Sequence, residues 1–247
     1  MPETDDDLAT MTSAAAGDAF EAADAALLGT GATEQHSLHL PVSVDSIRAE
    51  HLTEELVEAA PDHDLQFVRL PTMPYGLSEH HMNFPGTVTL SEDAYRQVIV
   101  DIGTSLATHG VERLVVVNCH GGNISAIKSA AAELTRHHDI KTHFINWTSY
   151  ARERLEAEFG EGWGHAGEHE TSVIEHYRPD LVETEKKEPQ NNRAKPETRP
   201  YAYYDEVTEK GGLSDPTNSD PEVIGEVIEE ATNDILEALN RDIEAGW

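Results

Sequence analysis

The sequence predicts an α/β fold in which a largely parallel sheet carries helices on both faces. Short apolar segments alternate with segments of helical periodicity along most of the chain. Strands that are joined through helices pair in parallel, and the crossovers place those helices on the two faces of the sheet. A chain of 247 residues suffices for one sizeable α/β core, so we expect a single domain over residues 1–247.

The first third of the chain predicts two strands and two helices. Residues 1–12 are polar and acidic, and we expect them to fray. An Ala-rich segment predicts a helix over 14–24, and the apolar run 25–29 predicts the first strand. Apolar positions on one helical face predict a helix over 46–59, and the apolar segment 65–70 predicts the second strand.

The middle of the chain continues the alternation. Residues 71–85 predict a loop, 87–90 a short strand, and 91–109 a helix whose acidic first turn suits the helix dipole. The segment 114–118 is continuously apolar, which is typical of a strand buried on both faces of a parallel sheet. It leads directly into Cys119, which is followed by His120 and two glycines.

The last part of the chain predicts four more regular elements and one long irregular segment. Residues 124–137 predict a helix, 142–146 a strand and 150–159 another helix. Residues 183–206 are polar and rich in Pro and Asn, and we expect a long loop or arm there. An apolar stripe over 221–245 predicts a closing amphipathic helix.

The charge balance excludes some partners. The formal net charge of −30 repels nucleic acid and anionic membranes, so we expect neither as a partner. The acidic residues are spread along the chain and Lys is scarce, a pattern that favours a halophilic source, in which acidic surfaces maintain solubility. Self-repulsion predicts that the fold loosens when salt is removed, because salt screens it.

Membrane spans, leader sequence and disulfides are not indicated. No apolar run approaches the roughly 20 residues that a membrane-spanning helix needs. The N-terminus lacks the basic and apolar regions of a signal peptide, so we expect a cytoplasmic protein. The single cysteine, Cys119, excludes an internal disulfide and is expected to be a small packing residue.

One short segment concentrates potential metal ligands. Residues 33–45 contain Glu34, His36, His39 and Asp45, directly after the first predicted strand. Carboxylate and imidazole groups are the ligands of hydrolytic zinc and manganese centres. In extended chain, Glu34 and His36 point to the same side. Ligands of a parallel sheet bind beyond the carboxyl ends of its strands, so this segment and the histidine after 114–118 are expected to meet.

Four segments, in this order and spacing, resemble the creatininase (creatinine amidohydrolase) family over about residues 25–182. They are 31–36 with 39–41 and Asp45, then 74–87, 118–123 and 164–172. The resemblance implies a three-layer α/β/α sandwich with a mostly parallel central sheet, and a homohexamer. It implies hydrolysis of C–N bonds in non-peptide amides with two divalent metal ions. We expect Zn, with Mn or Fe as alternatives at one site, and a small-molecule amide as the substrate.

The resemblance also implies roles for single residues. Glu34, Asp45 and His120 match ligands of one metal ion. His36 and Asp45 match ligands of the second, so Asp45 bridges the two. His165 matches a histidine that shuttles protons, as a histidine near its ordinary pKa can. His39 is instead expected to support the ligands from behind.

The sequence departs from the family pattern where the second metal ion is held. Creatininase places a Glu two residues after the equivalent of His120, and this chain has Gly122. Glu170 is expected to fill the gap as a ligand and to act in catalysis beside the histidine shuttle, with Glu168 as the alternative. Ser37 stands where a Gly is usual.

The substrate pocket and the substrate remain open at this stage. We expect the pocket to be lined by Ser78, His80, His81, Gly121 and Trp163, although a surface loop explains the two adjacent histidines equally well. A phosphorylated substrate would need a cation from among Arg48, Arg96, Arg193 and Lys195.

Three functions are compatible with these residues. The main prediction is a metal-dependent amide hydrolase that attacks with a metal-bound hydroxide. Relatives with the His-Gly-Gly-Asn form include deformylases that act on a formylaminopyrimidine nucleotide in archaeal flavin and deazaflavin synthesis, and peptidase-like enzymes of redox-cofactor maturation. An alternative of another class is a metal-binding scaffold that has lost catalysis, for which Gly122 gives some support.

Overall fold

Four parallel strands form the central sheet in the order β2-β1-β3-β4. The computed structural model describes residues 6–193, 198–199 and 201–247. The strands are β1 (Ala25–Thr30), β2 (Phe67–Met73), β3 (Arg113–Asn118) and β4 (Lys141–Asn146). All four were predicted within a few residues, and the parallel pairing confirms the expected α/β fold.

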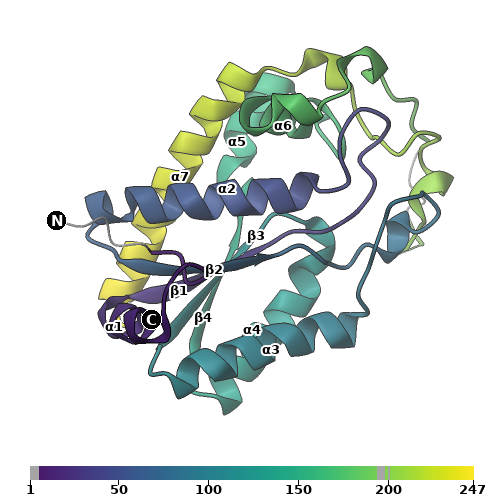
Figure 1. Ribbon diagram of the computed structural model, residues 1–247. Helices are drawn as coiled ribbons and strands as arrows, with labels where there is room; N and C mark the ends of the chain where they lie inside the picture. The colour runs from purple at the N-terminus through teal and green to yellow at the C-terminus, as the bar shows by residue number, and fades with distance from the viewer. Residues whose placement is uncertain (1–5, 194–197, 200) are drawn as a thin grey trace.

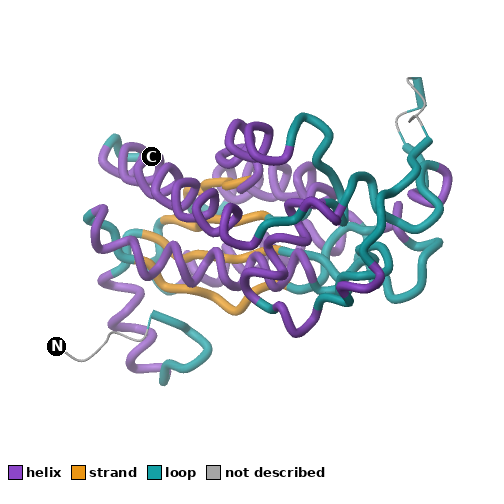
Figure 2. The backbone as a smooth tube through the Cα atoms, turned by 90° about the horizontal axis from the view of Figure 1, so that it is seen from above, coloured by secondary structure: helices purple, strands orange, loops and turns teal. Residues whose placement is uncertain are grey.

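The carboxyl ends of the strands lie level with one another. Thr30 at the end of β1 pairs with Asn118 at the end of β3, which in turn pairs with Asn146 at the end of β4. The loops that follow these strands therefore begin at one edge. Figures 1 and 2 show that the longest loops gather at this end of the molecule, opposite both termini.

Helices cover both faces of the sheet and make three layers (Figure 1). One face carries α2 (Val44–Ala59), α5 (Trp147–Phe159), α6 (Glu168–Tyr177) and α7 (Pro221–Glu244). The other carries α1 (Ser13–Ala22), α3 (Glu92–Thr108) and α4 (Ile124–His137).

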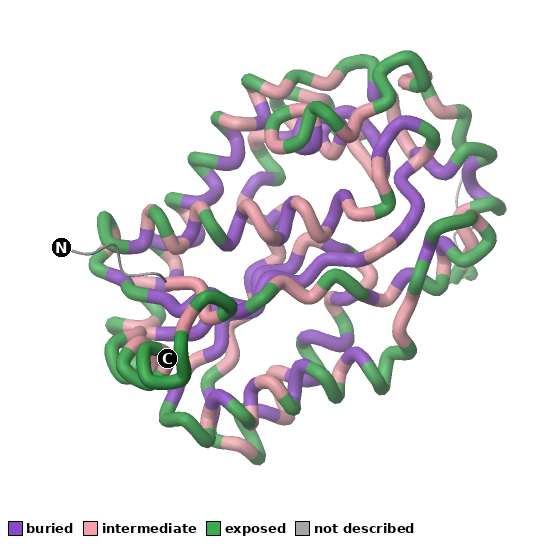
Figure 3. The backbone as a smooth tube through the Cα atoms, in the orientation of Figure 1, coloured by how far each residue is buried: buried purple, intermediate pink, exposed green. Residues whose placement is uncertain are grey.

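Two apolar cores follow from the alternation of side chains along the strands. Leu27 and Val115 contribute to the core under α2, whereas their neighbours Leu28 and Val116 contribute to the core under α3 and α4. Figure 3 shows the strands as buried along their length in the middle of the molecule. A sheet buried on both faces holds its strand ends in fixed positions.

The N-terminal segment and the short predicted strand differ from expectation. Residues 6–12 are not frayed, because Arg69 of β2 accepts a hydrogen bond from the Leu8 amide and donates one to the Asp6 carbonyl. Residues 1–5 lie outside the described part. The strand predicted over 87–90 is wrong, because Val88 and Thr89 form only isolated bridges to two different loops. The alternating pattern of this segment therefore belongs to a loop and not to a strand.

Two helices begin earlier than predicted, and both shifts affect the site. α2 begins at Val44, so Asp45 lies in its first turn, and α5 begins at Trp147, directly after β4. The predicted arm over 183–206 is irregular with short 3-10 turns, and its residues 194–197 and 200 lie outside the described part. Among the helices that the structure describes, none has the length and apolar content needed to cross a membrane.

Candidate metal centre

The predicted ligands converge at the carboxyl edge of the sheet. Glu34 lies in the loop after β1, His120 follows β3, Asp45 lies in the first turn of α2, and Glu170 lies in the first turn of α6. Glu34, Asp45 and His120 are at most 5% exposed. These elements surround a cavity of about 580 Å³. The level strand ends thus bring together residues that are far apart in the chain.

Asp45 lies between two histidines. Its Oδ2 is 3.1 Å from His120 Nδ1, and its Oδ1 is 3.5 Å from His36 Nε2. The two oxygens of one carboxylate therefore face two different imidazoles. A carboxylate in this position can contribute one oxygen to each of two cations, which is the arrangement that a bridging role requires.

The first group of candidate ligands consists of Glu34, Asp45 and His120. Their ligand atoms lie within 4.8 Å of one another, and Glu34 Oε2 is 3.4 Å from His120 Nε2. Each side chain comes from a position immediately beyond a strand or in the first turn of a helix. The packed sheet and α2 therefore fix the geometry of this group.

The second group consists of His36, Asp45 and Glu170. Glu170 Oε2 lies 3.6 Å from His36 Nε2, and the three ligand atoms again lie within 4.8 Å. Glu168 is buried too, but it joins no such group among the described residues. The structure therefore brings Glu170, not Glu168, to the place where a carboxylate is needed.

Gly122 lies where the backbone leaves no room for a side chain. A Cβ on Gly122 would overlap the Leu77 carbonyl oxygen and the His120 imidazole. A Glu there would need a different loop conformation. The chain therefore lacks the carboxylate that creatininase carries at this position. Glu170 of α6 brings a carboxylate to the same group of candidate ligands instead.

The donor set fits a pair of divalent cations. Three buried atoms make no hydrogen bond and lie 3.1–3.6 Å from other candidate ligand atoms: Glu34 Oε2, His36 Nε2 and Asp45 Oδ2. Buried polar atoms almost always have a partner, so three unpartnered ones that converge require an explanation. Metal ions supply it, because imidazole and carboxylate ligands satisfy such atoms by coordination.

The pKa values of the two histidines show the same attraction for positive charge. Burial alone would lower the pKa of His36, but the carboxylates of Asp45 and Glu170 outweigh it and raise the pKa to about 9. Burial also opposes protonation of His120, yet Glu34 and Asp45 raise its pKa to about 10. Burial raises the pKa of Glu34 to about 7. A proton and a metal ion compete for the same electrostatic environment.

His165 lies against this centre with one nitrogen facing it. Its ring centroid is 4.3 Å from that of His36, and its Nε2 donates to the Gln35 carbonyl oxygen at 2.8 Å. In the tautomer that makes this shorter bond, Nε2 carries the hydrogen and Nδ1 is free to accept a proton; the Gln35 side-chain nitrogen lies 3.1 Å from the same Nε2. Nδ1 lies 3.6 Å from Glu34 Oε1. Burial holds the pKa of His165 well below its ordinary value, so the expectation of a near-ordinary pKa is wrong for metal-free protein and the ring is neutral at pH 7.

Backbone strain accompanies two of these side chains. Ser37 follows His36 with φ of 59°, and Ala166 follows His165 with φ of 51°. Residues with a Cβ rarely adopt this left-handed conformation, and a usual Gly at position 37 is explained by it. The Ala166 amide also donates to Glu170 Oε2 at 2.6 Å, so the strained turn orients a candidate ligand.

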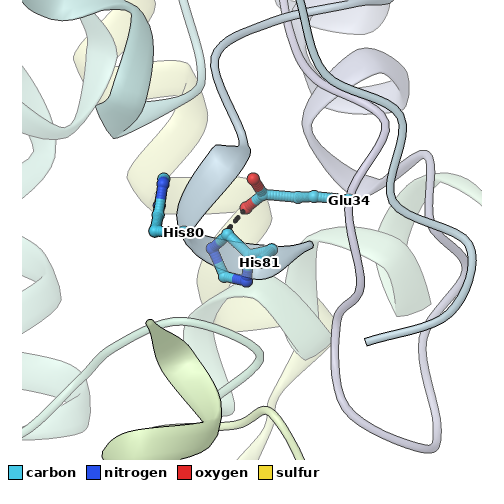
Figure 4. A group of neighbouring side chains, drawn as sticks. All are labelled: Glu34, His80 and His81. Atoms are coloured by element: carbon cyan, nitrogen blue, oxygen red, sulfur yellow. Dashed lines mark ion pairs between the residues drawn. The ribbon is translucent and has the colours of Figure 1, made fainter. Parts of the chain in front are cut away.

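The two adjacent histidines line the cavity beside Glu34. Both belong to the 3-10 turn η2 (Glu79–His81), and Figure 4 shows them close to the Glu34 carboxylate. His81 is buried, and its Nε2 is 3.4 Å from Glu34 Oε1. A solvated surface loop is therefore the wrong explanation for His81. With Glu34 the two histidines form another group whose ligand atoms lie within 4.8 Å.

Of the other predicted pocket residues, some line the cavity and one does not. Gly121 and Trp163 line the cavity, and the Trp163 ring meets His169 edge-on at 4.8 Å. Ser78 is fully buried behind the lining, with its side chain beside Glu34, and its role as a substrate contact stays a prediction. Its backbone N–H donates a hydrogen bond to Thr89 Oγ1 at 2.9 Å.

Sequence reasoning missed three residues of the site. They are Gln35, His169 and Tyr204. Gln35 Nε2 lies 2.7 Å from His81 Nδ1 and its position between two ligands was a usable signal. Tyr204 packs on the His81 ring with centroids 3.9 Å apart. It comes from the irregular segment after 183, where no pattern indicates which residue folds back.

Of the four basic residues that the sequence suggested for a phosphorylated substrate, one reaches the cavity. Arg48 lines it, whereas Arg96 pairs with Glu133 on the α3–α4 face. Arg193 is exposed, and Lys195 lies outside the described residues.

The fold and this cluster define a class: an α/β/α protein with a carboxylate–imidazole centre at the carboxyl edge of its sheet. The chain belongs to the creatininase family, because the family model described as "Creatininase: Creatinine amidohydrolase" matches residues 9–239.

Comparisons with individual proteins agree with this family assignment. A mycofactocin precursor peptide peptidase of Mycolicibacterium smegmatis is 33% identical over 220 residues, which cover 87% of this chain and 84% of that protein. A creatinine amidohydrolase of Pseudomonas putida is 28% identical over 178 residues, covering 65% of this chain and 66% of that protein.

Solved structures resemble the fold. A crystal structure of creatinine amidohydrolase superposes with a TM-score of 0.83 at 24% identity, covering 96% of this chain and 97% of that one. A structure described as "Creatininase Mn" superposes with a TM-score of 0.81 at 23% identity, over 96% of this chain and 98% of that one. At this identity the likeness concerns the fold, and it confirms the three-layer architecture.

Proposed function

We propose that this protein is a metal-dependent amide hydrolase with two divalent metal ions in the centre around Asp45. The observation that carries the proposal is the convergence of three buried, unpartnered ligand atoms from Glu34, His36 and Asp45. Zn is our first expectation, with Mn or Fe as alternatives at one site. Bound there, such ions supply a hydroxide at neutral pH and polarise an amide carbonyl.

The chain's own residues would divide the remaining work. Glu34 and His120 hold one side of the centre, and His36 and Glu170 hold the other. His165 Nδ1 can take a proton and deliver it to the departing nitrogen, because its neutral ring faces the carboxylates. The retention of His165 beside Glu170 argues against a scaffold that has lost catalysis.

We infer a linear amide, with a peptide bond included, as the substrate class. The sequence favoured a non-peptide amide, but the relatives are named for a peptide and for creatinine alike. The similarity to the peptide peptidase is higher and covers more of the chain. Gly122 also leaves no room for the Glu that creatininase carries there, which weakens creatinine as the substrate.

A panel assay tests the proposal. The protein is stripped of metal with a chelator, reloaded with Zn, Mn or Fe, and offered short peptides, formamides, small lactams and creatinine. We expect hydrolysis of a linear amide that disappears on chelation and returns with one of the metals. Persistent hydrolysis by a fully stripped sample would exclude the mechanism, and no hydrolysis with any metal would favour the scaffold.

We also propose a homo-oligomer and dependence on salt. Large exposed apolar side chains occur in loops at the site end of the molecule, including Leu38, Val42, Tyr75, Met82 and Val88. They would be covered in a homohexamer, and light scattering on a sized sample tests this. Loss of the circular-dichroism signal in salt-free buffer tests the effect of the −30 charge. A monomer, or an unchanged spectrum, contradicts the respective proposal.

A further inference from the structure

Arg48 is a buried cation that the proposed chemistry does not use. It is 3% exposed, and none of its three guanidinium nitrogens has a hydrogen-bond partner. A buried guanidinium with no partner is costly, so such groups are normally paired with an anion. Arg48 lines the same cavity as Asp45 and His120.

The position of Arg48 on α2 points it toward the centre. Arg48 follows Asp45 by three residues, and side chains three apart share a helix face. The first turn of α2 faces the loop-rich end of the molecule (Figure 1). A group bound by Arg48 would therefore lie in the same cavity as the carboxylate that joins the two ligand groups.

The surroundings of Arg48 leave its charge uncompensated within the cavity. Its guanidinium lies over the Trp147 ring. Cys119 lines the same cavity and lies beside the guanidinium, where it offers a thiol and no carboxylate. His169 lines the cavity as well and presents an imidazole, not a carboxylate.

Two carboxylates act on Arg48 from a distance without pairing with it. Glu170 belongs to the candidate metal ligands, and Glu55 accepts a hydrogen bond from Tyr177 at 2.6 Å on the other side. Neither accepts a hydrogen bond from Arg48. With the ligand carboxylate engaged by a cation, the guanidinium fork remains open to an anion that enters the cavity.

We propose that Arg48 binds a carboxylate group of the substrate beside the amide that is cleaved. The planar fork of arginine matches a carboxylate in two parallel hydrogen bonds. A single guanidinium neutralises a carboxylate but not a doubly charged phosphate, and the carboxylates of the centre would repel the excess. The proposal rests on the proposed function and narrows its substrate to amides that carry a nearby carboxylate.

Binding of matched probes tests the proposal without turnover. The probes are N-acetylglycine, N-acetyl-β-alanine, their neutral primary amides and inorganic phosphate, titrated calorimetrically into metal-free and metal-loaded protein. The variants are Arg48→Met and Arg48→Lys, with Arg96→Met as the matched change outside the cavity. Circular dichroism verifies the fold of each.

We expect wild-type protein to bind the better acid about 10- to 100-fold more tightly than its amide, the range for a charged hydrogen-bonded pair. Arg48→Met should abolish this ratio, Arg48→Lys should retain part of it, and Arg96→Met should leave it unchanged. If Arg48→Met does not fold, Arg48→Lys with a reduced ratio still supports the proposal. An undiminished ratio in any folded Arg48 variant, or no preference in wild-type protein, overturns it.

Two further outcomes would distinguish the kind of anion that Arg48 binds and the fate of the proposed function. If phosphate binds more tightly than either acid and Arg48→Met loses this binding, the Arg48 site recognises a phosphate group and the carboxylate proposal is wrong. Preference for the acids without hydrolysis of any amide would refute the proposed function and leave the anion site standing.

Discussion

The two sides of the Asp45 carboxylate are built differently. On one side, Glu34 and His120 follow adjacent central strands, and their positions are fixed by the packed sheet. On the other side, His36 meets Glu170, which arrives from the first turn of α6 after a strained turn at Ala166. The comparison teaches that the sheet fixes one group of ligands, whereas the other depends on where a distant helix begins.

The second side also compensates for a missing carboxylate. The loop after β3 turns so closely at Gly122 that a side chain cannot be placed there. Glu170 reaches the same centre from a different element, with an oxygen held by the Ala166 amide. Variants that affect the two sides separately can break this account or sharpen it.

The largest effect is expected from Asp45→Asn, because both sides share this carboxylate. The neutral amide cannot offer an anionic oxygen to each side, so metal binding should fail on both. We expect amide hydrolysis to fall by about 10³-fold or more. Initial rates and elemental analysis measure this. Asp101→Asn, an exposed change on α3, is the control, and full activity in Asp45→Asn would refute the bridging role.

Gly122→Ala should destabilise the fold by about 1–3 kcal/mol, the usual cost of overpacking. The added Cβ overlaps the Leu77 carbonyl and the His120 ring. Gly121→Ala is a matched control, because a Cβ at Gly121 meets nothing within 4 Å. Urea denaturation compares the two. Equal stability of both variants would mean that the loop accommodates side chains and that Gly122 is not a steric requirement.

Metal affinity should rise with pH on both sides of Asp45. In metal-free protein the pKa values of His36 and His120 are raised to about 9 and about 10, so both carry protons at pH 7 that a metal ion must displace. We expect about a tenfold gain in affinity per pH unit for each proton displaced, levelling off near pH 9–10. Competition with a chelator from pH 6 to 10 measures it. An affinity that does not change with pH contradicts the assignment.

The same shift has a stability consequence for metal-free protein. Raised histidine pKa values stabilise the folded state fully below the unfolded pKa of about 6.5, and that contribution is lost as pH rises through 9 and 10. Thermal unfolding of metal-free protein should accordingly show a lower melting temperature at pH 10 than at pH 7.

The smallest effect is expected from His39→Ala, and on one side only. His39 Nε2 lies 2.8 Å from Thr171 Oγ1, so it supports α6 next to Glu170. Burial lowers the pKa of His39 to about 4, which keeps it neutral at pH 7. We expect about tenfold weaker binding of one metal ion and unchanged binding of the other. Metal titration tests this with His137→Ala as the control, and equal weakening of both ions would contradict it.

The side fixed by the sheet could be predicted from local sequence, and the other could not. Glu34 and His120 each follow an apolar strand, and the rule that ligands lie at the carboxyl ends of parallel strands brings them together. Whether Glu168 or Glu170 faces the centre depends on the residue at which α6 begins. The helical periodicity of the sequence does not identify that residue. A shift of two residues turns a side chain to the opposite face of a helix.

Other features were hidden from the sequence for the same reason. Tyr204 reaches His81 from an irregular segment, and long-range loop packing has no local signal. The alternating residues 87–90 had a strand pattern, but Val88 and Thr89 pair with different loops. Arg48 was one of four candidate cations, and its burial against the Trp147 ring depends on a long-range contact that no local pattern indicates.

The metal content of three single-residue variants tests the central claim most directly. Wild-type protein, His120→Ala, Glu170→Gln and Glu168→Gln are purified in parallel, loaded with Zn and analysed for metal per chain. The account predicts two ions in wild-type protein and in Glu168→Gln, and one in each of His120→Ala and Glu170→Gln. Two ions in Glu170→Gln, or one in Glu168→Gln, would contradict a centre completed from α6 by Glu170.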